Sequence, residues 1–124
     1  MKVSKITISN RTKKKAEDLK NLFKDLNIVD WGNIPNFDVI INATSIGLKE
    51  DDEIKLDYSN IGSNKLFYDV IYNPKQTNFL KKAKASGNIT ENGKMMFIYQ
   101  AHQAFTIWHE LMPTIDDNVI KLIE

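Results

Sequence analysis

The fold is decided by residues 6–12, Ile6-Thr7-Ile8-Ser9-Asn10-Arg11-Thr12, where a short β-branched alternation gives way to polar residues. The alternation predicts a strand over residues 6–9, and Thr12 can cap the helix that follows. Dinucleotide-binding α/β folds read the adenosine ribose at such a strand end, after a glycine-rich loop that holds the phosphates. The first glycine of this chain is Gly32, well past that point. We therefore expect the chain to be the later part of a larger enzyme.

Strands and helices alternate along the rest of the chain. Apolar and β-branched runs predict further strands near residues 28–31, 37–42, 66–71 and 89–90. Helical periodicity and capping residues predict helices after Thr12, near 58–61, after Thr77, over 94–111 and after Asp116 or Asp117. The predicted fold is a single α/β domain over residues 1–124, with a Rossmann-like, three-layer parallel sheet that lacks its first strand.

Apolar residues at helical spacing mark the faces that we expect to pack inward. In the first helix they are Ala16, Leu19, Leu22, Phe23 and Leu26. In the helix after Thr77 they are Phe79, Leu80 and Ala83, and in the last helix they are Val119, Ile120 and Ile123. The helix over 94–111 is apolar around much of its girth, so we expect it to be well covered.

Composition argues against several classes of partner. The 124 residues carry 17 Lys and Arg against 16 Asp and Glu, and a net charge of +1 gives no argument for binding nucleic acid or an anionic membrane. There is no cysteine, which excludes disulfides and thiolate metal sites. No apolar stretch approaches the length of a membrane span. The expected location is therefore the cytoplasm.

Arg11 lies where a nucleotide-binding sheet would present the end of its second strand. An arginine there in place of an acid favours the 2′-phosphate of NADP, because a guanidinium can bind that group through two hydrogen bonds. Thr12 could add a hydroxyl and Lys15 a second cation. The alternative is a solvated basic helix start, and position alone does not decide between the two.

Two loops could carry further chemistry. Residues 42–47, Asn-Ala-Thr-Ser-Ile-Gly, follow a buried strand, at the place where open α/β sheets bind ligands. The alternative there is an ordinary strand-to-loop turn. Tyr72 follows the next strand and could hydrogen-bond a polar substrate, while Asp69 within that strand could brace the loop. A purely structural role for both residues is equally compatible with the sequence.

The long helix carries three polar side chains of interest. Gln100 lies in its otherwise apolar face, and a buried amide there would need a partner, either a polyhydroxylated ligand or a backbone carbonyl. His102 and His109 are seven residues apart and could share a face. Because no second cluster of acids or histidines stands at ligand spacing, we expect no metal site.

The order and spacing of these segments resemble the cofactor-binding half of the shikimate dehydrogenases, NADP-dependent enzymes of aromatic amino-acid (chorismate) biosynthesis. The matching segments span nearly the whole chain: Asn10-Arg11-Thr12 with Ala16, Asp38 to Ser45, Asp69 to Leu80, and Gly93 to Trp108. The resemblance implies an oxidoreductase that reduces 3-dehydroshikimate to shikimate. It implies a cofactor-binding set of Asn10, Arg11, Thr12, Lys15, Asn42, Ala43, Thr44, Ile71, Gly93 and Met96. The implied substrate-binding residues are Tyr72 and Gln100.

The chain departs from the family pattern in two respects. The family's turn usually reads Gly-x-Gly-Met-Leu, whereas residues 93–97 are Gly-Lys-Met-Met-Phe, which places Met95 beside the implied nicotinamide pocket. The family's substrate domain, with the lysine and aspartate that transfer the proton, has no counterpart among these residues. We therefore assign no catalytic residue and expect this chain to be inactive alone.

Other functions stay open from the sequence. The chain could be a catalytically dead nucleotide-binding or regulatory module, or one half of a split enzyme. A quinate/shikimate dehydrogenase that prefers NAD is a further alternative, against which Arg11 argues. The expected partners are NADP(H) and shikimate or 3-dehydroshikimate, with no nucleic acid and no membrane. We also expect self-association through exposed strand edges.

Overall fold

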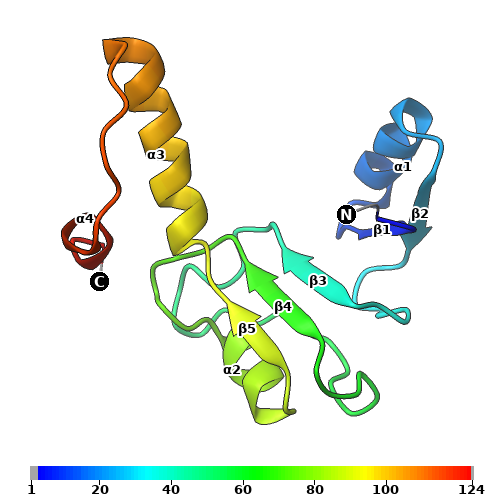
Figure 1. Cartoon of the computed structure of the whole chain (residues 1–124). Helices are drawn as coiled ribbons and strands as arrows, with labels where there is room; N and C mark the ends of the chain where they lie inside the picture. Colours follow the sequence, from blue (N-terminus) through cyan, green and yellow to red (C-terminus); the bar gives the residue numbers. More distant parts are fainter. Residues whose placement is uncertain (1–2, 124) are drawn as a thin grey trace. The chain divides into compact units, whose positions relative to one another are not determined.

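The computed structural model describes residues 3–123. The chain divides into two compact units, one of residues 3–37 with 55–61 and the other of residues 38–54 with 62–123. Both units are built of helices and parallel strands, which confirms the predicted α/β class (Figure 1). The strands form a two-stranded sheet in the first unit and a three-stranded sheet in the second.

The first unit is a strand–helix–strand unit. Its strands β1 (Ile6–Ser9) and β2 (Leu26–Val29) pair in parallel, and α1 (Lys13–Leu22) connects them (Figure 1). Parallel neighbours need a crossover of this kind, because a tight turn can join only antiparallel strands. The predicted strand over residues 6–9 is confirmed. The second strand begins two residues before the predicted 28–31 and ends at Val29.

The apolar face of α1 is less covered than its spacing predicts. Ala16 is 1% exposed, but Leu19 is 41%, Phe23 61% and Leu22 76% exposed. Leu26, expected on the same helical face, lies in β2. The two strands of this unit offer the helix a narrow surface, which covers little more than the small Ala16 side chain.

The second unit contains the larger sheet. Its strands β3 (Val39–Asn42), β4 (Leu66–Asp69) and β5 (Ile89–Glu91) lie in that order and are all parallel. Between β4 and β5 the chain forms α2 (Asn78–Ala85), which lies against one face of the sheet (Figure 1).

The core of the second unit lies between β4 and α2. Phe67 of β4 has no exposed surface, and its ring centroid is 5.2 Å from that of Phe79. Leu80 and Ala83 are buried beside them. The inward face predicted for the helix after Thr77 is therefore confirmed.

Several predicted boundaries differ from the structure. The strand expected over 37–42 begins only at residue 39, because residues 37 and 38 belong to the preceding loop. The strand expected over 66–71 ends at residue 69, because residues 70 and 71 belong to the following loop. Residues 59–61 form turns and a bend where a short helix was predicted over 58–61. Asp57 accepts hydrogen bonds from the Ser59 amide and hydroxyl, a local turn that competes with a helical one.

The long helix α3 (Lys94–His109) is mostly uncovered, which makes the prediction of a well-covered helix wrong. Ile98 is its one buried residue, whereas Trp108 is 76% exposed. Among the described residues no other helix or strand packs along α3. The helix ends two residues before the predicted Leu111, because Glu110 adopts a left-handed φ of 52°.

The last helix, α4 (Asp117–Lys121), is capped by Asp116 as predicted. Its carboxylate accepts from the N–H groups of Val119 and Asn118, which lower the pKa of Asp116. None of the three residues expected to face inward is fully buried. None of the helices between residues 3 and 123 combines the length and apolar character that a membrane crossing requires.

Two threonines stand at helix starts, but only one of them caps. Thr77 Oγ1 accepts from Leu80 N at 3.4 Å and donates to the buried Asp69 carboxylate at 2.6 Å. Thr12 occupies the N-cap position of α1, yet its side chain makes no capping hydrogen bond, so that prediction is wrong. The two residues differ in ψ, 94° for Thr12 and 163° for Thr77, and only the more extended one brings its hydroxyl to the helix amides.

We predict that Thr77→Ala lowers the free energy of opening of α2 by about 2–4 kcal/mol. A lost cap is worth about 1 kcal/mol, and a buried acceptor left without its donor about 1–3 kcal/mol. Thr77→Ser, which retains the hydroxyl, should lose much less. Thr12→Ala should change the opening of α1 by less than about 0.5 kcal/mol. Amide hydrogen exchange in the two helices measures all three variants, and equal losses for Thr77→Ala and Thr12→Ala would contradict this account.

Candidate functional site

Three loops follow the carboxyl ends of the parallel strands of the second unit. Residues 43–47 follow β3, residues 70–77 follow β4, and residues 92–93 lead from β5 into α3. Asn42 and Asp69, the last residues of β3 and β4, stand opposite each other in the sheet. Since all three strands are parallel, the loops meet at one edge, which is where open α/β sheets bind ligands.

The Asp69 carboxylate holds two of these loops together. It has no exposed surface and accepts hydrogen bonds from Asn42 Nδ2 at 3.1 Å, from Ile71 N at 3.0 Å and from Thr77 Oγ1 at 2.6 Å. A buried carboxyl group needs such donors, because its hydration is lost on folding. The loop-bracing role considered for Asp69 therefore has a clear geometric basis.

Asn42 braces the loop that follows β3. Its Oδ1 accepts from the Thr44 amide at 3.0 Å and from Thr44 Oγ1 at 2.8 Å, while its Nδ2 also donates to the Ile46 carbonyl at 3.0 Å. The side chain is 3% exposed, so its amide forms hydrogen bonds within the protein and is not accessible to a ligand. Ala43, by contrast, is exposed, and Thr44 is half-buried. A ligand that reached this loop would meet residues 43 and 44, in the conformation that Asn42 imposes.

Gly93 brings the start of α3 against the end of β4. A Cβ atom at this position would lie 1.9 Å from the Val70 carbonyl oxygen, and the Gly93 amide donates to the Ile71 carbonyl at 3.1 Å. The φ of Gly93 is −76°, which any residue can adopt. Glycine is therefore required here by the close backbone approach alone.

This approach places the first turn of α3 beside Tyr72. The ring of Tyr72 stacks on that of Phe97, with centroids 4.7 Å apart and planes inclined by 25°. Within residues 3–123 the Tyr72 hydroxyl has no hydrogen-bond partner, although the residue is half-buried. Ile71, just before it, is 6% exposed.

The remaining predicted site residues of this unit, Met96 and Gln100, are exposed side chains of α3. Met96 is 41% exposed. Gln100 is also exposed, so the interpretation of its amide as a buried group in need of a partner is wrong. The reason is that no other helix or strand of the described chain packs along α3. The Gln100 side chain is instead available to a ligand.

The predicted adenosine-end residues belong to the first unit, at the junction of β1 and α1. Asn10 Nδ2 donates to the Thr12 carbonyl at 2.8 Å, which shapes the turn. Arg11 and Lys15 are exposed, and neither forms an ion pair with a described residue. The Thr12 hydroxyl is likewise not used for capping. Arg11, Lys15 and the Thr12 hydroxyl thus have no partner among the described residues, and the exposed Lys14 beside them has no ion pair there either.

Lys13 behaves differently from its basic neighbours. Its ammonium group lies 3.0 Å from the Asp30 carboxylate, at the end of β2. This hydrogen bond and the charge of Asp30 raise the pKa of Lys13. Lys13 is therefore already paired, an ion pair that the sequence analysis did not predict.

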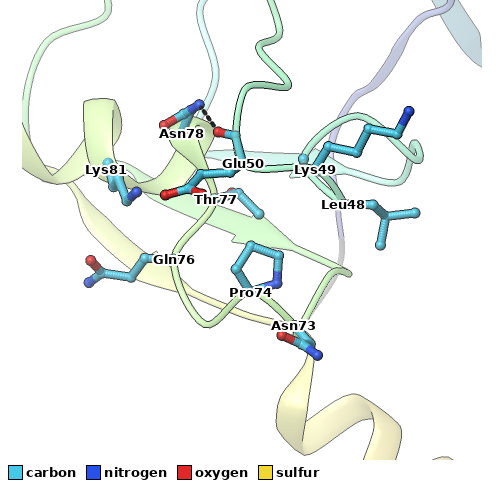
Figure 2. Close-up of a pocket in the computed structure, with 10 residues that line it drawn as sticks. Leu48, Lys49, Glu50, Asn73, Pro74, Gln76, Thr77, Asn78 and Lys81 are labelled. Carbon is cyan, nitrogen blue, oxygen red and sulfur yellow. Dashed lines mark hydrogen bonds between the residues drawn. The ribbon is translucent and has the colours of Figure 1, made fainter.

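A shallow cavity of about 320 Å³ lies beside the Asp69 network, between the loop after β3 and the start of α2 (Figure 2). Asn78 lines it and donates to the Glu50 carbonyl at 2.9 Å. None of the predicted site residues lines this cavity. In the described part of the chain, no three His, Asp or Glu side chains gather closely enough to hold a metal ion.

Sequence reasoning missed two contributions to the site. The contact of Phe97 with Tyr72 was not anticipated, although an aromatic residue one turn after Gly93 was a usable signal. Gly47 adopts a φ of 120°, and a Cβ there would meet Thr77 Cγ2 at 3.0 Å. Its glycine therefore allows the loop after β3 to pack on the cap of α2.

Comparisons with known proteins give a consistent result. No family model matches the chain. Over 124 residues the chain is 56% identical to the NADP(+) shikimate dehydrogenase of Pelagibacter ubique (strain HTCC1062), covering 100% of this chain and 47% of that protein. It aligns at a TM-score of 0.83 and 34% identity with a crystal structure of a shikimate dehydrogenase in complex with NADP+, covering 96% of this chain and 45% of the other.

A third similar protein is a quinate dehydrogenase from Corynebacterium glutamicum, solved in complex with NAD. The alignment has a TM-score of 0.80 at 27% identity and covers 98% of this chain and 46% of the other. The chain thus spans about half the length of the curated relatives that it matches. Solved structures of similar proteins contain NADP+ or NAD.

We predict that Gly93→Ala destabilises the second unit by about 3 kcal/mol or displaces the start of α3, because the new methyl group overlaps the Val70 carbonyl. Gly62→Ala is the matched control, since a Cβ at Gly62 meets no atom within 4 Å but its φ of 74° disfavours alanine. That control should lose only about 1–2 kcal/mol. Urea unfolding measures both losses. A Gly93→Ala loss no larger than that of the control would show that the contact between Gly93 and Val70 relaxes freely.

Proposed function

We propose, on the premise that the whole chain is homologous to the shikimate dehydrogenase family, that it forms the NADP-binding half of an oxidoreductase that reduces 3-dehydroshikimate to shikimate. It would act in the cytoplasm, in the biosynthesis of chorismate and aromatic amino acids. Residues 1–124 would be part of the cofactor-binding domain, together with the helices that return toward a substrate domain. The observation that carries the proposal is that Arg11 and Lys15, just after β1, are exposed and form no ion pair with any residue between 3 and 123.

The turn at residues 10–12 fits the adenosine end of NADP. Arg11 is the reader of the 2′-phosphate, since its guanidinium is exposed and can bind an anion through two hydrogen bonds. Lys15 adds a second positive charge. The Thr12 hydroxyl makes no capping hydrogen bond to α1, so it can bind a ligand. The Asn10 side chain keeps the turn in shape through its bond to the Thr12 carbonyl.

The loops of the second unit fit the rest of the cofactor. Ala43 and Thr44 would contact its middle, in a loop whose shape Asn42 maintains. Ile71, Gly93 and Met96 would border the nicotinamide, which supplies the hydride when it is bound. Gly93 serves by letting α3 begin against β4.

Tyr72 and Gln100 would form one wall of the substrate cleft. The Tyr72 hydroxyl and the exposed Gln100 amide both have hydrogen-bonding capacity that no described residue uses. Shikimate carries several hydroxyl groups, which such side chains can bind. We assign proton transfer to no residue of this chain. We propose that a region equivalent to the half of the relatives that this chain does not cover performs it. By itself the chain would be inactive.

The NAD-dependent alternative has one observation in its favour, the likeness to a quinate dehydrogenase solved with NAD. An NAD-binding turn gains from a carboxylate that accepts hydrogen bonds from the ribose hydroxyls. Here the side chain after Asn10 is arginine, and the nearby Asp30 is occupied by Lys13. Both features favour NADP.

We predict that Arg11→Ala weakens binding of adenosine 2′,5′-bisphosphate to the 124-residue chain by about ten- to 150-fold, the equivalent of a lost charged hydrogen bond of 1.5–3 kcal/mol. Binding of adenosine 5′-monophosphate should change little, because it lacks the 2′-phosphate. Lys13→Ala is the matched control, since Asp30 already holds that ammonium group. Titrations followed by NMR give all the dissociation constants.

Two results would contradict the cofactor assignment. Equal losses for the two nucleotides would show that Arg11 does not read the 2′-phosphate. A Lys13→Ala effect as large as that of Arg11→Ala would show that binding follows the general positive charge of the helix start.

We further predict that Tyr72→Phe and Gln100→Ala each weaken binding of shikimate by about two- to tenfold, because each removes one hydrogen-bonding group. Both variants should bind adenosine 2′,5′-bisphosphate as the unaltered chain does. An NMR titration with shikimate measures the first effect. If neither variant alters the shikimate constant, the substrate assignment fails while the cofactor assignment stands.

A further inference from the structure

Phe97 is the residue of the site that the proposed function does not use. Its ring lies 4.7 Å from that of Tyr72, with planes inclined by 25°, which is within the range of favourable offset stacking. Phe97 is also 38% exposed. The ring contact with Tyr72 is the aromatic contact that Phe97 makes within the described residues.

Both rings are attached to backbone that is held in place. The Phe97 amide donates to the Gly93 carbonyl at 2.9 Å, and the Gly93 amide donates to the Ile71 carbonyl at 3.1 Å. Ile71 immediately precedes Tyr72 and donates its own amide to the buried Asp69 at 3.0 Å. The stack therefore joins two anchored segments, the loop after β4 and the first turn of α3.

We propose that Phe97 is a positioning residue that holds the Tyr72 ring in the orientation in which its hydroxyl binds the substrate, an inference that rests on the proposed function. The hydroxyl has no partner among residues 3–123, so no hydrogen bond within the described chain orients it. A tyrosine side chain has two freely varying torsions, and fixing them before binding removes that entropic loss from the binding step. The stack covers one face of the ring and leaves the hydroxyl free.

The stack also accounts for an aromatic residue at this position. Leucine at position 97 would retain the apolar character but lacks a flat π face, so it cannot define the tilt of the neighbouring ring. Tyrosine at position 97 would keep that face. The two substitutions therefore separate apolar contact from stacking.

The test uses NMR of the 124-residue chain with labelled tyrosine rings, in the unaltered form and as Phe97→Leu, Phe97→Tyr and Tyr99→Leu. Phe97→Leu should move the Tyr72 ring resonances, through loss of the ring current, and should weaken shikimate binding about two- to tenfold. Phe97→Tyr should restore both. Tyr99 is 56% exposed on the same helix and forms no ring contact, so Tyr99→Leu should leave the Tyr72 resonances unchanged.

Three results would overturn the inference. Unchanged Tyr72 resonances in Phe97→Leu would show that there is no stack in solution. An unchanged shikimate constant in Phe97→Leu, where Tyr72→Phe does weaken binding, would show that the stack does not position the hydroxyl. Absence of any shikimate response in the unaltered chain would also overturn it, and the titration with adenosine 2′,5′-bisphosphate then decides separately whether the cofactor part of the proposed function stands.

Discussion

The buried carboxylate of Asp69 is the interaction on which the second unit depends. It stands at the end of β4 and accepts hydrogen bonds from the end of β3, from the loop after β4 and from the capping residue of α2. A carboxyl group shut off from water is stable only when such donors surround it. The same donors therefore fix the directions in which the loops after β3 and β4 leave the sheet. The shape of the loop after β4, and through Asn42 that of the loop after β3, therefore depends on this one group.

Several parts of the fold were predictable from short-range patterns, although the cap at Thr12 and the short helix at residues 58–61 were not. The strand at residues 6–9, the helix capped by Thr77 and the cap at Asp116 all rest on local propensity and on side-chain-to-backbone hydrogen bonds, and all three are present. The coverage of α1 and α3 was not predictable in this way. Apolar periodicity shows which face of a helix prefers burial, but it does not show whether the chain supplies a surface to cover that face. Leu22 and Trp108 are the clearest examples, each 76% exposed.

For the candidate site, the places of Tyr72 and Gly93 in the fold were predictable but their contacts were not. The motifs placed Tyr72 and Gly93 at the ends of neighbouring strands, which followed from the α/β pattern. The stack between Tyr72 and Phe97 depends on the approach of Gly93 to the Val70 carbonyl, a tertiary contact with no short-range signature. The pairing of Lys13 with Asp30 is similar, because it depends on the parallel register of β1 and β2. Sequence reasoning singled out Arg11 and Lys15 for the cofactor but did not anticipate that Lys13 pairs with Asp30.

That pair of charges also makes the start of α1 sensitive to ionic strength. Lys13 and Asp30 are both largely exposed, so dissolved ions screen their attraction. The screening length in water is about 8 Å at physiological salt and becomes shorter as salt is added. The attraction of Arg11 and Lys15 for an anion outside the chain is screened in the same way. The contact between Tyr72 and Phe97 is apolar, and salts such as sulfate strengthen apolar association. Added sulfate should therefore weaken the attraction between Lys13 and Asp30 in the first unit. It should strengthen the contact between Tyr72 and Phe97 in the second.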